Sequence, residues 1–181
     1  MRTRNIWILI VIVVLILLGI LFFSDKILQN IFNEPYQNYN LDNMNDKVET
    51  DINKLFVEDQ RAVIYLPNRV AEIKQGEAYG VAYGIRNVLD TQKFSWQFKV
   101  ADEDLNNKCG VDNVKANSWI ITGREGEVTL KNNEVHANIV RIKVPEGSIS
   151  DVSTCIIKYE LIVKKENGEI YDTQYFQVDI R

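Results

Sequence analysis

The hydrophobic residues of this 181-residue chain follow two different patterns. From Ile6 to Phe23, 18 consecutive positions carry no charged or strongly polar side chain. A membrane hydrocarbon core about 30 Å thick needs roughly 20 apolar residues in a helix, and flanking residues can compensate for a small mismatch. The pattern predicts a single N-terminal transmembrane helix over 6–23, with Ile6, Trp7, Phe22 and Phe23 at its ends as the membrane anchor.

The charges around this run predict its orientation. Arg2 and Arg4 precede it in a short tail, residues 1–5, that holds no acidic residue. By the positive-inside rule the tail stays in the cytoplasm and the rest of the chain is exported. A cleaved signal peptide is the alternative, but it would have a shorter apolar stretch followed by small residues. Because Phe22 and Phe23 stand where small residues would be needed, an uncleaved anchor is favoured.

A polar segment follows the anchor. Apolar residues at helical spacing continue the predicted helix to about residue 33, and Pro35 ends it because proline lacks a backbone donor. Residues 34–60 are rich in Asn, Asp and Glu, which predicts a solvated stalk or linker. Within it, Val48, Ile52, Leu55 and Phe56 recur at helical spacing. A short amphipathic helix over 46–56, packed on the following domain, would explain this spacing.

From residue 61 onward the pattern changes to short runs of β-branched and aromatic residues separated by Gly, Asn, Asp and Pro. This pattern is typical of strands and turns, and the Asn167-Gly168 pair predicts a tight hairpin. The predicted strands are Ala62–Leu66, Arg69–Lys74, Ala78–Asn87, Lys93–Val100, Trp119–Thr122, Glu127–Leu130, Val135–Val144, Thr154–Lys164 and Ile170–Ile180. The prediction is therefore an all-β domain over 61–181, an antiparallel β-sandwich of seven to nine strands.

Alternation of apolar and polar residues assigns the buried faces of two strands. In the first, Phe94, Trp96, Phe98 and Val100 share one side, which makes Trp96 a core aromatic residue. In the second, the same period places five apolar residues on one side: Cys155, Ile157, Tyr159, Leu161 and Val163.

The order of these segments resembles the immunoglobulin-like superfamily in its broad sense. The strand FSWQF, with Trp96 at its centre, is followed by a return through VPEG, a strand CIIKYELIV and a final hairpin NGEIYDTQYFQVDI. The chain is most similar to the adhesion-type and accessory sandwich modules of archaeal and bacterial surface proteins. The resemblance implies an immunoglobulin-like β-sandwich over 61–181 and a role in interactions, although the cysteine pattern differs from that of antibody domains.

Cys109 and Cys155 are the two cysteines of the chain. In an exported domain a disulfide is the default state. If Lys93–Val100 and Thr154–Lys164 are neighbouring antiparallel strands of the sandwich, the two cysteines lie close together, and a bridge would attach the loop 102–118 to the sheet. Two reduced, buried cysteines are the alternative.

Composition argues against several functions. Beyond the anchor the chain holds 19 basic and 25 acidic residues, a poor balance for binding nucleic acid. No nucleophile motif, metalloprotease motif or phosphate loop occurs, and the single histidine, His136, lies within a strand pattern. We therefore expect no enzyme activity, no cofactor and no metal centre. The residues that come nearest to a metal site are Asp102, Asp104 and Asn106, a candidate Ca²⁺ loop. This loop departs from the EF-hand pattern at its glycine and glutamate positions.

These features together predict a single-pass protein of the cell membrane with an extracytoplasmic domain. We expect a non-catalytic interaction or adhesion module of the cell envelope, whose partner is another envelope or surface protein. One alternative is a structural subunit of a surface filament, although the residues that type IV pilins need around their apolar helix are missing. Another is an accessory subunit of a membrane complex. The sequence makes no prediction of the oligomeric state.

Overall fold

The computed structural model describes residues 49–149 and 155–181, which belong to one compact unit. The predicted anchor over 6–23, its extension to residue 33 and the first part of the stalk lie outside the described residues. Within the described ranges, no helix has the length and hydrophobicity needed to cross a membrane.

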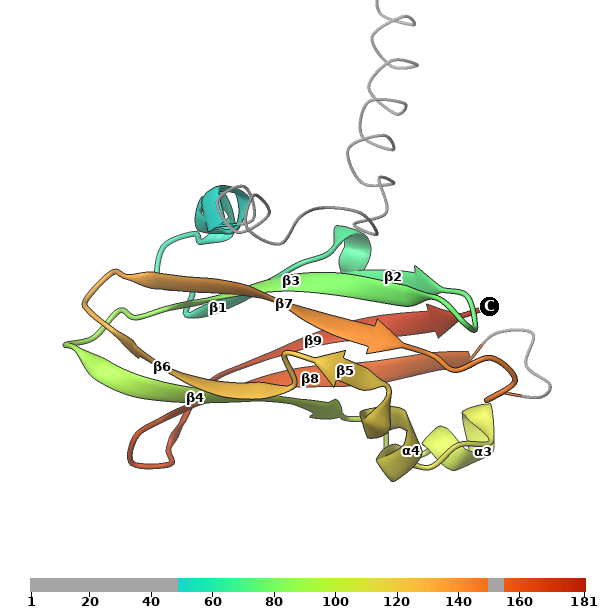
Figure 1. Ribbon diagram of the computed structural model, residues 1–181. Coiled ribbons are helices and arrows are strands. Elements are labelled where there is room, and N and C mark those ends of the chain that lie inside the picture. Colours follow the sequence, from blue (N-terminus) through green and yellow to red (C-terminus); the bar gives the residue numbers. More distant parts are fainter. Residues whose placement is uncertain (1–48, 150–154) are drawn as a thin grey trace, which may run out of the picture. The chain divides into compact units, whose positions relative to one another are not determined.

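Two β-sheets face each other and enclose the core (Figure 1). In spatial order, the four-stranded sheet holds β1 (Ala62–Tyr65), β3 (Ala78–Arg86), β7 (Val135–Lys143) and β5 (Ile120–Thr122). The five-stranded sheet holds β2 (Val70–Ile73), β9 (Ile170–Ile180), β8 (Cys155–Lys165), β4 (Gln92–Val100) and β6 (Glu125–Leu130). The predicted all-β sandwich is confirmed, and each of the nine predicted strands corresponds to an observed strand.

One pair of strands differs from the antiparallel prediction. β2 runs parallel to β9, with Val70 opposite Gln177 and Ile73 opposite Ile180. The first two strands are one polypeptide run interrupted by a 3₁₀ turn, η1 (Pro67–Arg69), in which Asn68 has φ 50°. At this turn the chain leaves the four-stranded sheet and continues in the other, so β2 reaches β9 while running in the same direction. For this reason the second strand begins at Val70 and not at Arg69.

The core follows the predicted alternation along the strands. All four predicted inward residues of β4 are buried, and Phe94 and Phe98 are fully so. Phe98 meets Tyr83 of β3 edge to face, with ring centroids 4.9 Å apart. Trp96 is buried as predicted. Burial of these large rings from both sheets is the main favourable contribution to folding.

A helical segment at residues 49–55 packs against the outer face of the four-stranded sheet. Ile52 is fully buried there, between Val63 of β1 and Ala82 of β3. Gly84 makes room for it, because a Cβ atom at position 84 would overlap with the Ile52 side chain. The amphipathic helix predicted from the spacing around Ile52 is confirmed over these residues, and the packed part of the chain extends N-terminally of residue 61.

Candidate functional site

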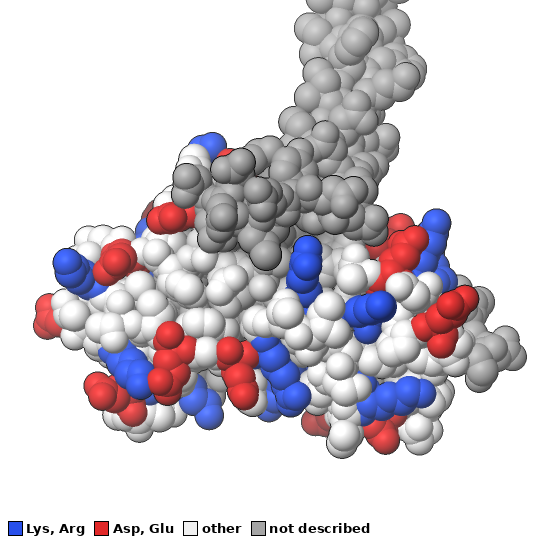
Figure 2. Space-filling model, in the orientation of Figure 1, with Lys and Arg blue, Asp and Glu red and all other residues white. Residues whose placement is uncertain are grey.

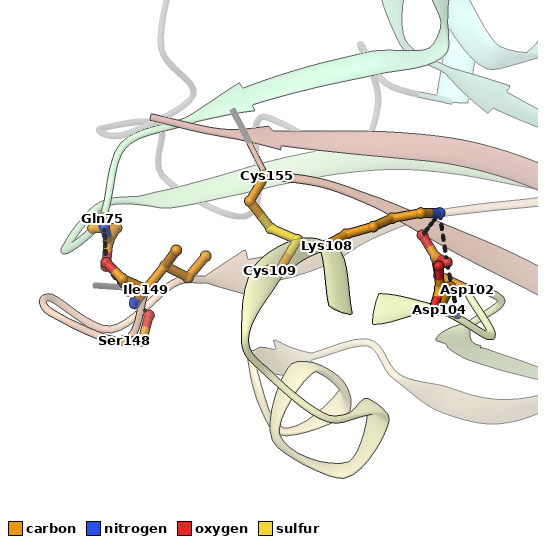
Figure 3. Close-up of a disulfide and its surroundings, with 8 residues drawn as sticks. All are labelled: Gln75, Asp102, Asp104, Lys108, Cys109, Ser148, Ile149 and Cys155. Atoms are coloured by element: carbon orange, nitrogen blue, oxygen red, sulfur yellow. Dashed lines mark hydrogen bonds and ion pairs between the residues drawn. A yellow bond between two sulfur atoms is a disulfide. The ribbon is translucent and has the colours of Figure 1, made fainter. Parts of the chain in front are cut away.

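The disulfide lies at one end of the sandwich, where a helical insertion meets the five-stranded sheet (Figure 3). Cys109 ends the short helix α3 (Leu105–Cys109), and Cys155 is the first residue of β8. Both are buried and bonded to each other, with their Cα atoms 5.3 Å apart. The predicted bridge is confirmed.

The insertion between β4 and β5 contains two helices, in a region, 102–118, for which a loop was predicted. α3 buries Leu105 and Cys109, which are four residues apart on one face, and Gly110 ends it with φ 66°. In α4 (Asn113–Ser118), the Asp112 carboxylate accepts a hydrogen bond from the Lys115 N–H at 2.7 Å. An aspartate before the first turn and a glycine after the last are the signals that could have revealed them.

Two hydrogen bonds fix α4 to the sheet beside the bridge. The Tyr159 hydroxyl of β8 donates to the Ala116 carbonyl at 2.9 Å, and burial raises the pKa of this hydroxyl. The Val100 N–H of β4 donates to the Asn117 side-chain oxygen at 2.8 Å. The insertion is therefore held to the five-stranded sheet at three points, of which the disulfide is the covalent one.

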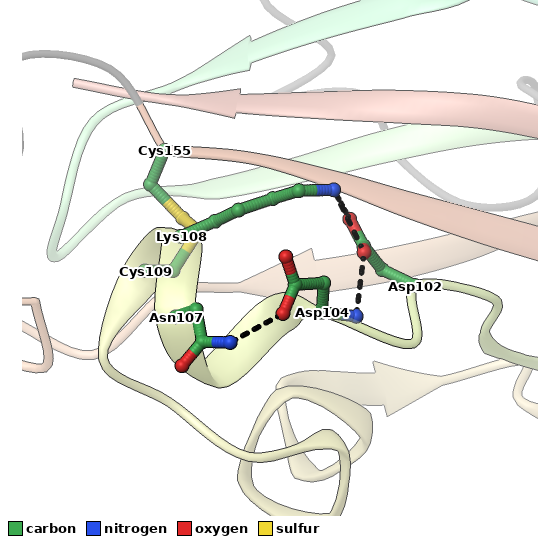
Figure 4. A network of polar contacts seen from close by, with 6 residues as sticks. All are labelled: Asp102, Asp104, Asn107, Lys108, Cys109 and Cys155. Carbon is green, nitrogen blue, oxygen red and sulfur yellow. Dashed lines mark hydrogen bonds and ion pairs between the residues drawn. A yellow bond between two sulfur atoms is a disulfide. The ribbon is translucent and has the colours of Figure 1, made fainter.

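The candidate Ca²⁺ loop lies directly before α3, and its carboxylates have other partners (Figure 4). The Lys108 ammonium lies 3.0 Å from Asp102 Oδ1, which also accepts a hydrogen bond from the Asp104 N–H. The Asp104 carboxylate accepts one from the side chain of Asn107, while Asn106 lies in the helix. In residues 49–149 and 155–181, no three His, Cys, Asp or Glu side chains gather in a way that could hold a metal ion.

We expect millimolar Ca²⁺ to leave the melting temperature of the protein unchanged, because the ion would have to displace the Lys108 ammonium from Asp102. Thermal unfolding followed by circular dichroism in Ca²⁺ and in a chelator measures this. Lys108→Ala is the matched variant, since it frees Asp102 while leaving the other oxygen ligands in place. A rise in melting temperature of the unmodified protein with Ca²⁺ would contradict the expectation.

His136, the single histidine of the chain, packs against aromatic rings of the core. It lies in β7 and is half-buried, with its ring centroid 4.8 Å from that of Trp96. Its Nε2 atom is buried and has no hydrogen-bond partner among the described residues. Burial lowers the pKa of the imidazole, and the nearby Glu49 carboxylate partly opposes that shift. A catalytic base needs a nucleophile or substrate within hydrogen-bond reach, and the described residues offer Nε2 no hydrogen-bond partner.

The surface of the described unit carries charges of both signs, interspersed on the face seen in Figure 2. On the outer side of the five-stranded sheet, Lys99 of β4 pairs with Glu160 of β8 at 3.1 Å. On the same side, Lys158 lies over the ring of Tyr175, 4.1 Å from its centroid. Tyr175 and Ile156 are large apolar side chains that remain exposed on this sheet. This outer face therefore combines paired charges with two exposed side chains, one aromatic and one aliphatic.

Comparison with known proteins gives likenesses of fold. No family model matches the chain, and no curated protein matches it. Among solved structures, the chain is similar to the periplasmic chaperone SfaE, with TM-score 0.43, 6% identity and coverage of 66% of this chain and 56% of that one. It is also similar to a Niemann-Pick type C2 protein from Japanese carpenter ant, with TM-score 0.41, 11% identity and coverage of 70% of this chain and 99% of that one. For a mutant SrpA adhesin from Streptococcus sanguinis, the TM-score is 0.37 and the identity 12%, with coverage of 69% of this chain and 60% of that one.

Proposed function

We propose that this protein is a membrane-anchored, non-catalytic interaction module on the outer side of the cell membrane. The observation that carries the proposal is the disulfide between Cys109 and Cys155, because such bonds persist in oxidising compartments and are rare in the cytosol. The apolar run over 6–23, with Arg2 and Arg4 before it, supports the same location. The disulfide and the apolar run support the same location by independent physical arguments.

The arrangement of strands supports an immunoglobulin-like assignment of the sandwich. The first extended run is shared between the sheets, so that β1 pairs with β3 and β2 pairs with β9. The central strands β3 and β7 face β9, β8 and β4 across the core. Domains of this class serve as binding modules in many surface proteins, but function is carried by particular surfaces and not by the fold.

The outer face of the five-stranded sheet is the surface that we assign to the partner, another protein of the cell envelope. The opposite outer face is partly occupied by the helical segment at 49–55, where Ile52 is fully buried. By contrast, Tyr175 and Ile156 stand exposed among paired charges. Tyrosine is enriched in protein interfaces because its ring contributes contact area and its hydroxyl can hydrogen-bond.

A photo-crosslinking residue placed at position 175 of the full-length protein in its native membrane tests this assignment. We expect a discrete product with another envelope protein, since the probe would stand within the interface. The matched control is the same probe at Val114, an exposed residue of α4 away from that face. No product above background from this probe, or from the same probe placed at the exposed Ile156 of that face, would contradict the proposal. Products made only of copies of this chain would favour a filament subunit, and products with a polytopic protein would favour an accessory subunit.

A further inference from the structure

Three aromatic side chains whose polar atoms have no partner among the described residues pack together in the core. Among the described residues, four buried side-chain polar atoms have no hydrogen-bond partner. Asp179 Oδ1 is one of them, but the other oxygen of that carboxylate binds Arg181. The remaining three are the Tyr83 hydroxyl, the Trp96 indole Nε1 and the His136 Nε2.

The three rings are neighbours, although they come from three strands and both sheets. The centroid of Trp96 in β4 lies 4.8 Å from that of His136 in β7 and 6.1 Å from that of Tyr83 in β3. The centroids of Tyr83 and His136 are 6.4 Å apart. Gly126 of β6 leaves space for the Trp96 ring, since a Cβ atom there would overlap with the indole. Three rings that each carry a buried polar atom without a partner among the described residues are therefore neighbours in the core.

Without a water molecule, such a cluster lowers the stability of the folded protein. A buried donor or acceptor that has lost its water and gained no partner is strongly unfavourable. Folded proteins usually resolve this with a buried water, which makes about three hydrogen bonds to groups that would otherwise be unsatisfied.

The chemistry of the three groups is complementary to one water molecule. An indole N–H can only donate, a neutral imidazole Nε2 can accept, and a tyrosine hydroxyl can do either. Burial lowers the pKa of His136, which keeps its ring neutral near pH 7. A water could accept from Trp96, donate to His136 and complete its set with Tyr83.

We propose that Tyr83, Trp96 and His136 form an internal binding site for an ordered water molecule, a fixed part of the folded sandwich. Tyr83 is fully buried and Trp96 nearly so, whereas His136 is half-buried. Exchange with bulk solvent therefore occurs past the imidazole, which is the least buried of the three side chains. The water hydrogen-bonds to side chains of both sheets, at a point where Tyr83, Trp96 and His136 make no hydrogen bond through these atoms to any described residue.

Tyr83→Phe in the full-length chain, purified in a mild detergent, tests the proposal by the sign of its effect. If the hydroxyl binds the water, its removal breaks a hydrogen bond and lowers the melting temperature by about 3 °C. If the core is dry, removal of an orphaned hydroxyl relieves a desolvation cost, and the melting temperature stays the same or rises. The second result would overturn the proposal. Tyr159→Phe is the calibrating control, because that hydroxyl has a protein partner, the Ala116 carbonyl, and its loss lowers the melting temperature in either case.

Nuclear magnetic resonance supplies a second readout that does not depend on stability. The Trp96 indole N–H signal, assigned by its absence in Trp96→Phe, should show a nuclear Overhauser effect with a long-lived water. The effect should weaken in Tyr83→Phe. Absence of any such effect in the unsubstituted protein would also overturn the proposal.

Discussion

Replacement of Cys109 and Cys155 together by alanine should lower the free energy of unfolding by about 3 to 4 kcal/mol. The bridge joins residues 46 positions apart, and opening it returns that length of chain to the unfolded ensemble. Both cysteines are buried and alanine is only slightly smaller, so little of the loss arises from packing. Urea denaturation of the full-length protein, followed by circular dichroism, measures the change.

The reducing agent provides the matched control for this prediction. The unsubstituted protein treated with dithiothreitol should lose the same stability, whereas the double alanine variant should be insensitive to the reagent. The loss should also loosen α4, which depends on the Tyr159–Ala116 and Val100–Asn117 hydrogen bonds once the covalent attachment is gone. An unchanged denaturation midpoint in the double variant would show that the bridge contributes nothing to the fold.

Ile52→Ala should lower the free energy of unfolding by about 2 to 4 kcal/mol, because it empties a fully buried position between the helical segment and the four-stranded sheet. Gly84→Ala acts on the same contact from the other side, since the added methyl group overlaps with the Ile52 side chain. The two substitutions should therefore be strongly non-additive: in the Ile52→Ala background the Gly84→Ala change has room and costs much less. Urea denaturation of the four proteins completes the cycle.

An exposed residue of the same segment is the control for the second prediction. Asn53→Ala, on the solvent side, should change stability by no more than about 0.5 kcal/mol. Equal, small effects at positions 52 and 53 would contradict the packed position of residues 49–55. Strict additivity of the Ile52 and Gly84 substitutions would do the same.

The strands were predictable because their signal is local. The alternation of Phe94, Trp96, Phe98 and Val100 with polar residues identifies both a strand and its buried face from nine consecutive residues. The Asn167-Gly168 turn likewise identifies the last hairpin, and Gly168 has the expected positive φ of 82°. Each of these features depends on residues that are neighbours in sequence.

The features that sequence patterns missed depend on distant residues or on very short elements. α3 and α4 have five and six residues, which is too short to show a helical period. The parallel pairing of β2 with β9 depends on the crossing at Pro67–Arg69 and brings residues 107 positions apart into register. The space that Gly84 provides for Ile52, and the meeting of Tyr83, Trp96 and His136, become visible only when the sheets are assembled.

The central claim, that residues 49–181 lie outside the cytoplasm, is tested most directly by a membrane-impermeant amine reagent and mass spectrometry. Lys54 and Lys99 are suitable reporters, with 69% and 43% of their side chains exposed. We predict that both are labelled in intact cells stripped of any outer layer and protected in inside-out membrane vesicles. Labelling in the vesicles together with protection in the cells would contradict the topology, and with it the exported interaction module.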